Sequence, residues 1–203
     1  MPVRTLEQAQ SDLALHLKPL SDLMDQAHAE FQRECRGIAH KLDARSRASV
    51  YRDLIVRNLR EYCDDAKGAT THRKGQLMLV GINNKWLLRV KRLRKGFTVA
   101  VSPTDASREF DANHVPDAAA DLFPDAPAAT CIYFGWSVPE NAPQTITKFL
   151  VCNDANRQVL WSLPLDSDTP PTVLETLPLA PVGPAVPPSR IRVKAARKQA
   201  ENE

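Results

Sequence analysis

Apolar residues recur at three- and four-residue steps along the first third of the chain, which is the period of an amphipathic helix. Over about residues 5–35 this spacing predicts helix, and Pro19 predicts a kink or two shorter helices, with Ser21 as a new N-cap. A second helix is predicted over about residues 45–65, with an apolar stripe formed by Tyr51, Leu54, Ile55, Leu59 and Tyr62. Its opposite face is basic and carries Arg45, Arg47, Arg52, Arg57 and Arg60.

After Gly75 the apolar residues alternate with polar ones, which is the period of a half-buried strand. The stretches QLMLVGI and KWLLRVKRL flank Asn83-Asn84 and predict a β-hairpin, because asparagine tolerates the positive φ of a tight turn. In the second strand Trp86, Leu88 and Val90 are expected on one face. The opposite face is expected to carry Lys85, Arg89 and Lys91.

Three later stretches, TCIYFGWSV, TITKFLVCN and RQVLWSLPL, predict a three-stranded meander. Residues 97–101 extend the strand pattern, and residues 104–123 predict an acidic, partly helical connection. The expected fold class is therefore α+β, with N-terminal helices packed on a five- to six-stranded antiparallel sheet.

The elements divide the chain into three parts: an N-terminal helical segment (1–65), a sheet domain packed on these helices (66–165) and a Pro-rich flexible tail (166–203). Eight of the sixteen prolines lie between Pro164 and Pro188, a density at which no packed core forms. The tail ends in SRIRVKAARKQAENE, which contains five basic residues. We therefore expect a disordered, basic C-terminal tail.

The composition is that of a globular protein, with 43% hydrophobic and 25% charged residues. No apolar run approaches the roughly 20 residues of a membrane span, and the N-terminus has no signal-peptide pattern, so we expect a cytoplasmic protein without a membrane partner. The four cysteines are isolated from one another and from ligand-spaced histidines, which argues against a zinc ribbon.

The charges are strongly segregated along the chain. Residues 66–104 contain nine Lys/Arg and no Asp or Glu, whereas residues 105–125 contain six acids and one Arg. This pattern predicts one positive and one negative surface. If the acidic segment folded back over the basic strand, it would neutralise the positive charges there and weaken their binding to another molecule.

Most catalytic signatures are absent from the sequence. Phosphate-binding glycine loops, the G-x-S-x-G elbow and H-E-x-x-H do not occur, and the basic hairpin lacks the carboxylates that a metal-dependent nuclease requires. We therefore expect no cofactor and no metal site. Metal-free RNA cleavage stays open as an alternative, with candidate residues His72, Arg73, Lys74, Arg89, Lys91 and Arg92.

Three segments, ARSRASVYRDLIVRNLREYC, KGQLMLVGINNKWLLRVKRL and TKFLVCNDANRQVLWSLPL, resemble in this order an uncharacterised family of bacterial and phage proteins. Its members have an R-x-R-A helix start, a strand like LLRFKKL and a closing hairpin with a Trp. Their genes lie beside regulators of the XRE helix-turn-helix type or the ImmA/IrrE metallopeptidase type. The resemblance spans about residues 45–165 and implies a toxin-antitoxin or phage-defence pair.

Charge pattern and resemblance together predict a toxin-like or effector component of a two-gene module, which acts through a basic surface. The expected partners are RNA or DNA, or the XRE-type or metallopeptidase-type regulator encoded nearby. An alternative is a non-catalytic module whose cationic strand binds an acidic surface of that regulator. The predicted binding residues are Arg52, Arg57, Arg60, Lys85, Arg89, Lys91, Arg92, Arg94 and Lys95.

Overall fold

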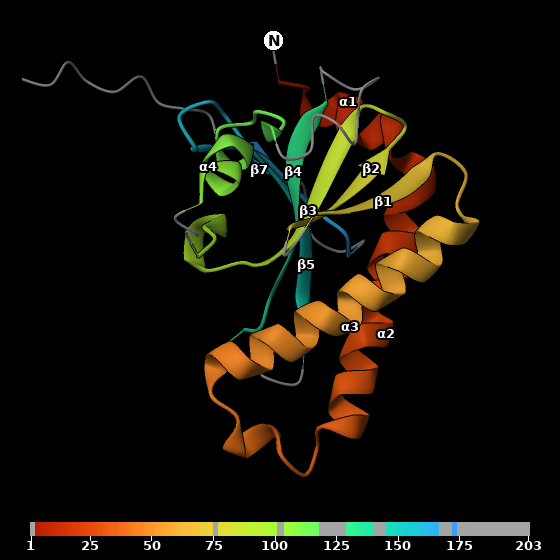
Figure 1. Ribbon diagram of the computed structural model, residues 1–203, viewed down its shortest axis with the longest axis vertical. Helices are drawn as coiled ribbons and strands as arrows, with labels where there is room; N and C mark the ends of the chain where they lie inside the picture. The colour runs from red at the N-terminus through yellow and green to blue at the C-terminus, as the bar shows by residue number, and fades with distance from the viewer. Residues whose placement is uncertain are drawn as a thin grey trace, which may run out of the picture.

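A computed structural model describes residues 3–74, 77–100, 104–117, 129–139, 145–166 and 172–173. The fold is α+β, as predicted, with helices on both faces of one sheet (Figure 1). Among the described residues, no helix combines the length and the apolar character that crossing a membrane requires. Most of the predicted tail lies outside the described residues, as does the acidic stretch 118–128.

Three helices cover one face of the sheet: α1 (Leu6–Asp12), α2 (Ala14–Glu34) and α3 (Ala44–Asp65). The prediction of two helices divided at Pro19, with Ser21 as a new N-cap, is wrong, because α2 continues through both residues and the division lies at Leu13. Pro19 lacks the N–H that would bond the carbonyl of Leu15, and Leu15 is 88% exposed. Asp43 caps α3 by accepting a bond from the Ser46 amide at 2.6 Å.

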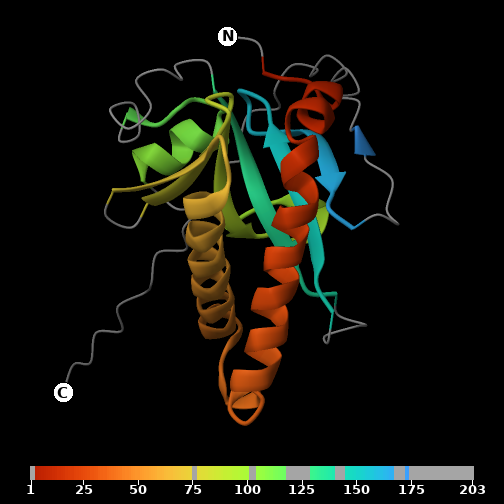
Figure 2. The same ribbon diagram turned by 90° about the vertical axis from the view of Figure 1, so that its right-hand side faces the viewer.

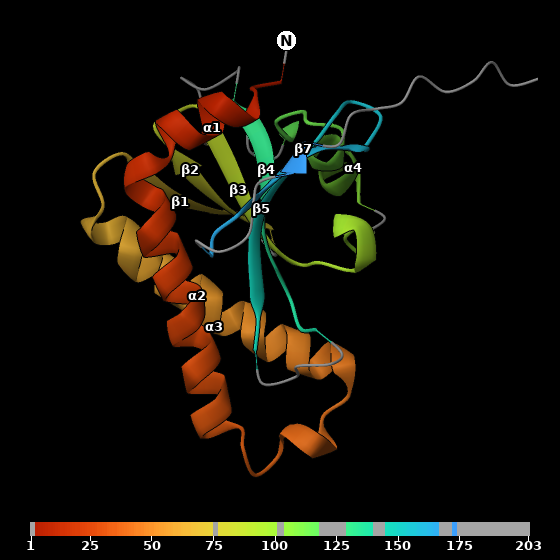
Figure 3. The ribbon, with the colours of Figure 1, turned by 180° about the vertical axis from the view of Figure 1, so that it is seen from behind.

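Helices α2 and α3 form a long antiparallel hairpin whose turn extends beyond the edge of the sheet (Figures 2 and 3). Two histidine–tyrosine pairs join the helices: His16 Nδ1 lies 2.5 Å from the Tyr62 hydroxyl, and His28 Nδ1 lies 2.6 Å from the Tyr51 hydroxyl. The short 3-10 helix η1 (Ala39–Lys41) lies in the turn. These histidines therefore act in helix packing.

The sheet has the strand order of the sequence, β1 to β7. The strands are β1 (Ala69–Lys74), β2 (Leu77–Ile82), β3 (Trp86–Arg92), β4 (Thr130–Ser137), β5 (Thr147–Asn153), β6 (Val159–Pro164) and the two-residue β7 (Thr172–Val173). The predicted hairpin is confirmed, and both Asn83 and Asn84 have φ of 52°. The predicted meander is confirmed as β4–β5–β6.

The prediction of a wholly antiparallel sheet is wrong at the centre, where β3 and β4 are parallel. The chain between them contains the 3-10 helix η2 (Lys95–Phe97) and α4 (Asp105–Asp111), and a connection of this length returns the chain to the starting edge. The carboxyl ends of β3 and β4 therefore lie side by side. Instead of the strand predicted over 97–101, the described residues form a single bridge between Leu93 and Val99.

The two faces of the sheet bury different clusters. The main core lies under α1–α3 and includes all three tryptophans, Trp86, Trp136 and Trp161, each at most 3% exposed. A smaller cluster on the other face packs Leu87, Tyr133 and Val151 with Phe110 of α4. On β3 this places Trp86, Leu88 and Val90 toward the main core, as predicted, and leaves Arg89 and Lys91 on the α4 face.

A buried cation joins the start of the predicted tail to the helices. The Lys148 ammonium group on β5 donates to the Ser21 hydroxyl at 2.9 Å and pairs with Asp25 and Asp166, each at 2.7 Å. Burial lowers the pKa of Lys148, but the bonds to Asp166 and Asp25 outweigh this effect and raise it. Lys148 is therefore held as a cation and is no base for Ser21.

Candidate anion-binding groove

A large groove lies at the carboxyl ends of the parallel strands β3 and β4. It encloses about 1460 Å³ between the first half of α3, the ends of these strands and the turn that follows β3. Crevices at the carboxyl ends of parallel strands are common ligand sites, because the connections on either side diverge there. The groove brings together residues that are about 50 positions apart in the sequence.

The lining of the groove is positively charged. Val90, Phe97, Trp136 and Phe149 contribute apolar surface, and no Asp or Glu lines the groove within the described part of the chain. The seven cationic lining residues are Arg45, Arg52, Arg89, Lys91, Arg92, Arg94 and Lys95. They come from α3 on one wall and from β3 and its following turn on the other, so an occupant meets positive charge from two sides.

Arg89 is held in place from behind by α4. Its guanidinium group donates to the Ser107 hydroxyl at 3.1 Å and lies 5.6 Å from the centre of the Phe110 ring. Asp111 accepts a hydrogen bond from the Tyr133 hydroxyl. Burial raises the pKa of Asp111, and the nearby charges of Arg89 and Lys91 oppose that shift. The acidic segment therefore balances part of the charge of Arg89 from the α4 side.

Lys91 is partly withdrawn from solvent at the groove. Its side chain is half-buried, and its ammonium group forms no ion pair with any described residue. The pKa of Lys91 is lowered to about 8, mainly by burial and also by the charges of Arg89 and Arg52, while Asp111 opposes this shift. The fold thus holds an ammonium group where it lacks water and a counterion, which is typical of functional sites.

The turn after β3 brings the outer cations over the groove. Leu93 packs directly on Gly135 of β4, where an added Cβ would lie 2.5 Å from the Leu93 Cγ atom, and the Leu93 amide donates to the Trp136 carbonyl at 2.7 Å. Gly96 has φ of 69°, which lets the chain reverse immediately afterwards. Arg94 and Lys95 are exposed on this turn.

Six of the nine predicted binding residues line the groove: Arg52, Arg89, Lys91, Arg92, Arg94 and Lys95. Of these, Arg52 pairs with Asp53 at 3.2 Å, and Arg92 donates weakly to the Ala44 carbonyl at 3.4 Å. Arg45 also lines the groove but was not among the predicted nine. The sequence already placed Arg45 on the basic face of the second helix. Only the fold shows that this turn of α3 faces β3.

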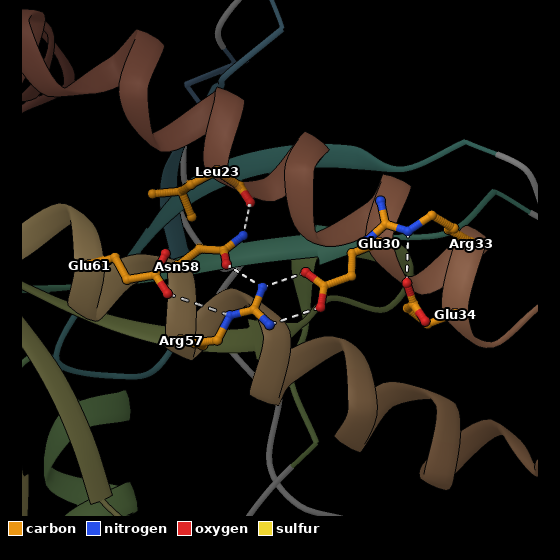
Figure 4. Close-up of polar contacts among 7 residues, drawn as sticks. All are labelled: Leu23, Glu30, Arg33, Glu34, Arg57, Asn58 and Glu61. Atoms are coloured by element: carbon orange, nitrogen blue, oxygen red, sulfur yellow. Dashed lines mark hydrogen bonds and ion pairs between the residues drawn. The ribbon is translucent and has the colours of Figure 1, made fainter.

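The other three predicted residues lie elsewhere. Lys85 is in the β2–β3 turn at the opposite end of β3, where it pairs with Asp12 at 2.8 Å. Arg60 is exposed on α3 and does not line the groove. Arg57 donates to both Glu30 carboxylate oxygens and forms a weaker ion pair with Glu61 at 3.7 Å (Figure 4). It also donates to the Asn58 side-chain oxygen, and the Asn58 amide donates to the Leu23 carbonyl at 3.1 Å. Arg57 therefore joins α2 to α3.

The candidate residues for RNA cleavage are only partly brought together. Arg89, Lys91 and Arg92 share the groove, whereas His72 and Arg73 are on β1, two strands away, and do not line it. Burial lowers the pKa of His72. Within the described ranges, no three His, Cys, Asp or Glu residues are grouped as metal ligands.

Comparison of the chain with protein-family models, with curated proteins and with solved structures finds no match. The family resemblance of the sequence therefore stays a prediction, and the functional conclusion depends on the groove.

Proposed function

We propose that the chain binds nucleic acid by its phosphates in the cationic groove. The observation that carries this proposal is the lining itself, which among the described residues has seven Lys/Arg from two walls and no carboxylate. A nucleic-acid strand carries one negative charge per nucleotide, so cations on both sides of a groove match it along its whole length. An acidic protein helix usually presents its charges on one face and matches such a groove less well.

The binding energy on this proposal comes mainly from the release of counterions as lysines and arginines neutralise phosphates. Phosphate contacts position a nucleic acid without reading its bases, so we expect little sequence preference from the groove. Arg89 is fixed by Ser107 and Phe110, and Lys91 is poorly hydrated, so both cations gain more from an anion than a solvated surface lysine does.

The test compares two triple variants of the full chain for binding to labelled RNA and DNA. The variant Lys91→Ala/Arg92→Ala/Arg94→Ala removes three groove cations. The matched control Lys18→Ala/Arg33→Ala/Arg108→Ala removes the same charge from exposed positions outside the groove. We expect the groove variant to bind at least about tenfold more weakly and the control to bind nearly like the wild type.

Equal losses in the two variants would show that only net charge matters, and the groove proposal would fail. If neither nucleic acid binds but an acidic partner protein is retained through the same three residues, the alternative of a protein-interaction module would be supported instead.

A second candidate function, metal-free RNA cleavage, is favoured by the pKa of about 8 for Lys91 beside Arg89. A neutral Lys91 amine would take the proton of a ribose 2′-hydroxyl, whose oxygen attacks the adjacent phosphorus while the 5′-oxygen leaves with a proton from water. Arg89 would stabilise the charge on the phosphate. This candidate predicts cleavage that persists in EDTA and is lost in Lys91→Ala.

The role in a two-gene module is a further proposal, which depends on the family resemblance and not on the groove. Growth of cells that express the chain alone, and then together with the neighbouring gene, tests this role. Inhibition that the neighbour relieves supports a toxin-like effector, and no effect on growth in either case argues against it.

A further inference from the structure

A second, smaller pocket opens beside the groove, between the α2–α3 turn and the carboxyl end of β4. It encloses about 380 Å³, at the lower end of the roughly 300–1,000 Å³ that is usual for small-molecule sites. Three aromatic rings form its base: Phe31 of α2, Tyr51 of α3 and Trp136 of β4. The Phe31 and Tyr51 rings are stacked with centroids 4.1 Å apart, and the Tyr51 and Trp136 centroids are 6.5 Å apart.

The rim of this pocket is polar and contains no described carboxylate. Gln32, His40, Arg47 and Arg92 surround the opening, and all four are half-buried or exposed. An amide, an imidazole and two guanidinium groups offer hydrogen bonds and flat stacking surfaces to a planar heteroaromatic ring. His28 holds the Tyr51 hydroxyl at 2.6 Å, so the position of the central ring is fixed from behind.

The pocket and the groove are adjacent. They share five lining residues: Ala48, Arg92, Trp136, Val138 and Pro139. Arg92 lies between the two spaces, so a phosphate bound by Arg92 in the groove would place its own sugar and base near the aromatic pocket.

We infer that the pocket binds one unstacked base of a single-stranded nucleic acid whose phosphates lie in the groove. This inference rests on the proposed function of the groove and adds the substrate class. In a duplex the bases are stacked and paired, and one base reaches a closed pocket only after costly extrusion. In a single strand, bases stack freely on aromatic and guanidinium surfaces. The chain therefore prefers single strands to duplexes of the same length.

The test measures binding by fluorescence anisotropy with three probes of about twelve nucleotides: a single strand, its duplex and an abasic strand with the same number of phosphates. We expect the wild type to bind the base-containing strand about tenfold more tightly than the abasic strand, because stacking of even one base contributes this much. We also expect the single strand to quench the fluorescence of Trp136, and Trp136→Phe to remove most of the quenching.

Two variants separate the pocket from the groove. Gln32→Trp fills the pocket from its rim, and Gln26→Trp places the same ring on an exposed position of the same helix. We expect Gln32→Trp to bind the abasic strand like the wild type but to lose the preference for bases, whereas Gln26→Trp keeps it. Loss of three groove cations that do not line the pocket, in Lys91→Ala/Arg94→Ala/Lys95→Ala, weakens binding of both strands.

Equal wild-type affinity for the base-containing and abasic strands would overturn the base pocket and leave the groove proposal intact. Tighter binding of the duplex than of the single strand would also overturn it. If the wild type binds none of the probes, the proposed function itself fails. If Gln32→Trp does not fold, the comparison of strands with the wild type still decides the question.

Discussion

Lys91 shows most clearly how a single residue links stability to function. Its ammonium group has a pKa lowered to about 8 by burial and by the neighbouring Arg89, so the folded state disfavours the charged form. Because the folded-state pKa is lower than that of the unfolded chain, the unfolded chain binds more protons and Lys91 reduces stability at neutral pH. A residue that reduces stability and is nevertheless present suggests a role in binding.

The first prediction concerns Lys91→Met, which keeps the volume and removes the charge. We expect it to stabilise the fold at pH 7 by on the order of 1 kcal/mol, after allowance for solvent screening of a half-buried group, and to weaken nucleic-acid binding. Chemical unfolding of both proteins measures the first effect. The gain should shrink as the pH rises from 8 to 10.5, and a variant that is less stable than the wild type at pH 7 would contradict this account of Lys91.

The second prediction concerns the pH dependence of binding. A bound phosphate favours the protonated form of Lys91, so affinity should fall as the pH rises from 7 to 9. The charged groups near Lys91 are Arg89, Arg52 and Asp111. We expect Lys91→Arg to bind with a much flatter pH profile. An equally steep profile in that variant would assign the effect to another group.

At the scale of elements, the contact between the turn after β3 and strand β4 positions the outer cations. Gly135→Ala would place a methyl group 2.5 Å from Leu93, so either the leucine or the turn has to move. We predict a destabilisation of about 1–3 kcal/mol together with weaker binding, because Arg94 and Lys95 move with the turn.

A double variant is the control for this third prediction. If the clash with Leu93 is the cause, the double variant Gly135→Ala/Leu93→Ala should lose less unfolding free energy than the two single variants lose together. Simple additivity in thermal unfolding would show that Gly135 is required for another reason.

Most individual elements were predictable from the sequence, because hydrophobic periodicity depends on local residues. The helix at Ala44–Asp65, the Asn83-Asn84 hairpin and the last three strands follow this rule. Strand β1 was missed, since ATTHRK is mostly polar and lies at the edge of the sheet. The helix boundary was misplaced at Pro19, because packing of α2 on the core overrides the local preference of proline.

The parallel pairing of β3 and β4 was not predictable from any local pattern. Antiparallel and parallel strands have the same alternation when both faces are covered, and here α4 covers part of the second face. This pairing determines where the groove forms, since it places the carboxyl ends of β3 and β4 together beside α3.

At the scale of the whole molecule, the positive charges that are clustered in the sequence are only partly clustered on the folded protein. The basic strand and its following turn supply five of the seven cations of the groove. The chain itself engages two of the three other predicted cations: Asp12 pairs with Lys85, and Glu30 pairs with Arg57. Whether a cation is compensated depends on which helix packs against it, and no run of charges in the sequence contains that information.

The most direct test of the central claim is the salt dependence of nucleic-acid affinity. Five groove cations form no ion pair among the described residues: Arg45, Lys91, Arg92, Arg94 and Lys95. If each neutralises one phosphate of a single strand, the logarithm of the association constant falls with the logarithm of salt concentration with a slope of about −3.5. In Lys91→Ala/Arg92→Ala/Arg94→Ala the slope should be shallower by about 2. A slope near zero, or the same slope in both proteins, would contradict the proposal that this groove binds phosphates.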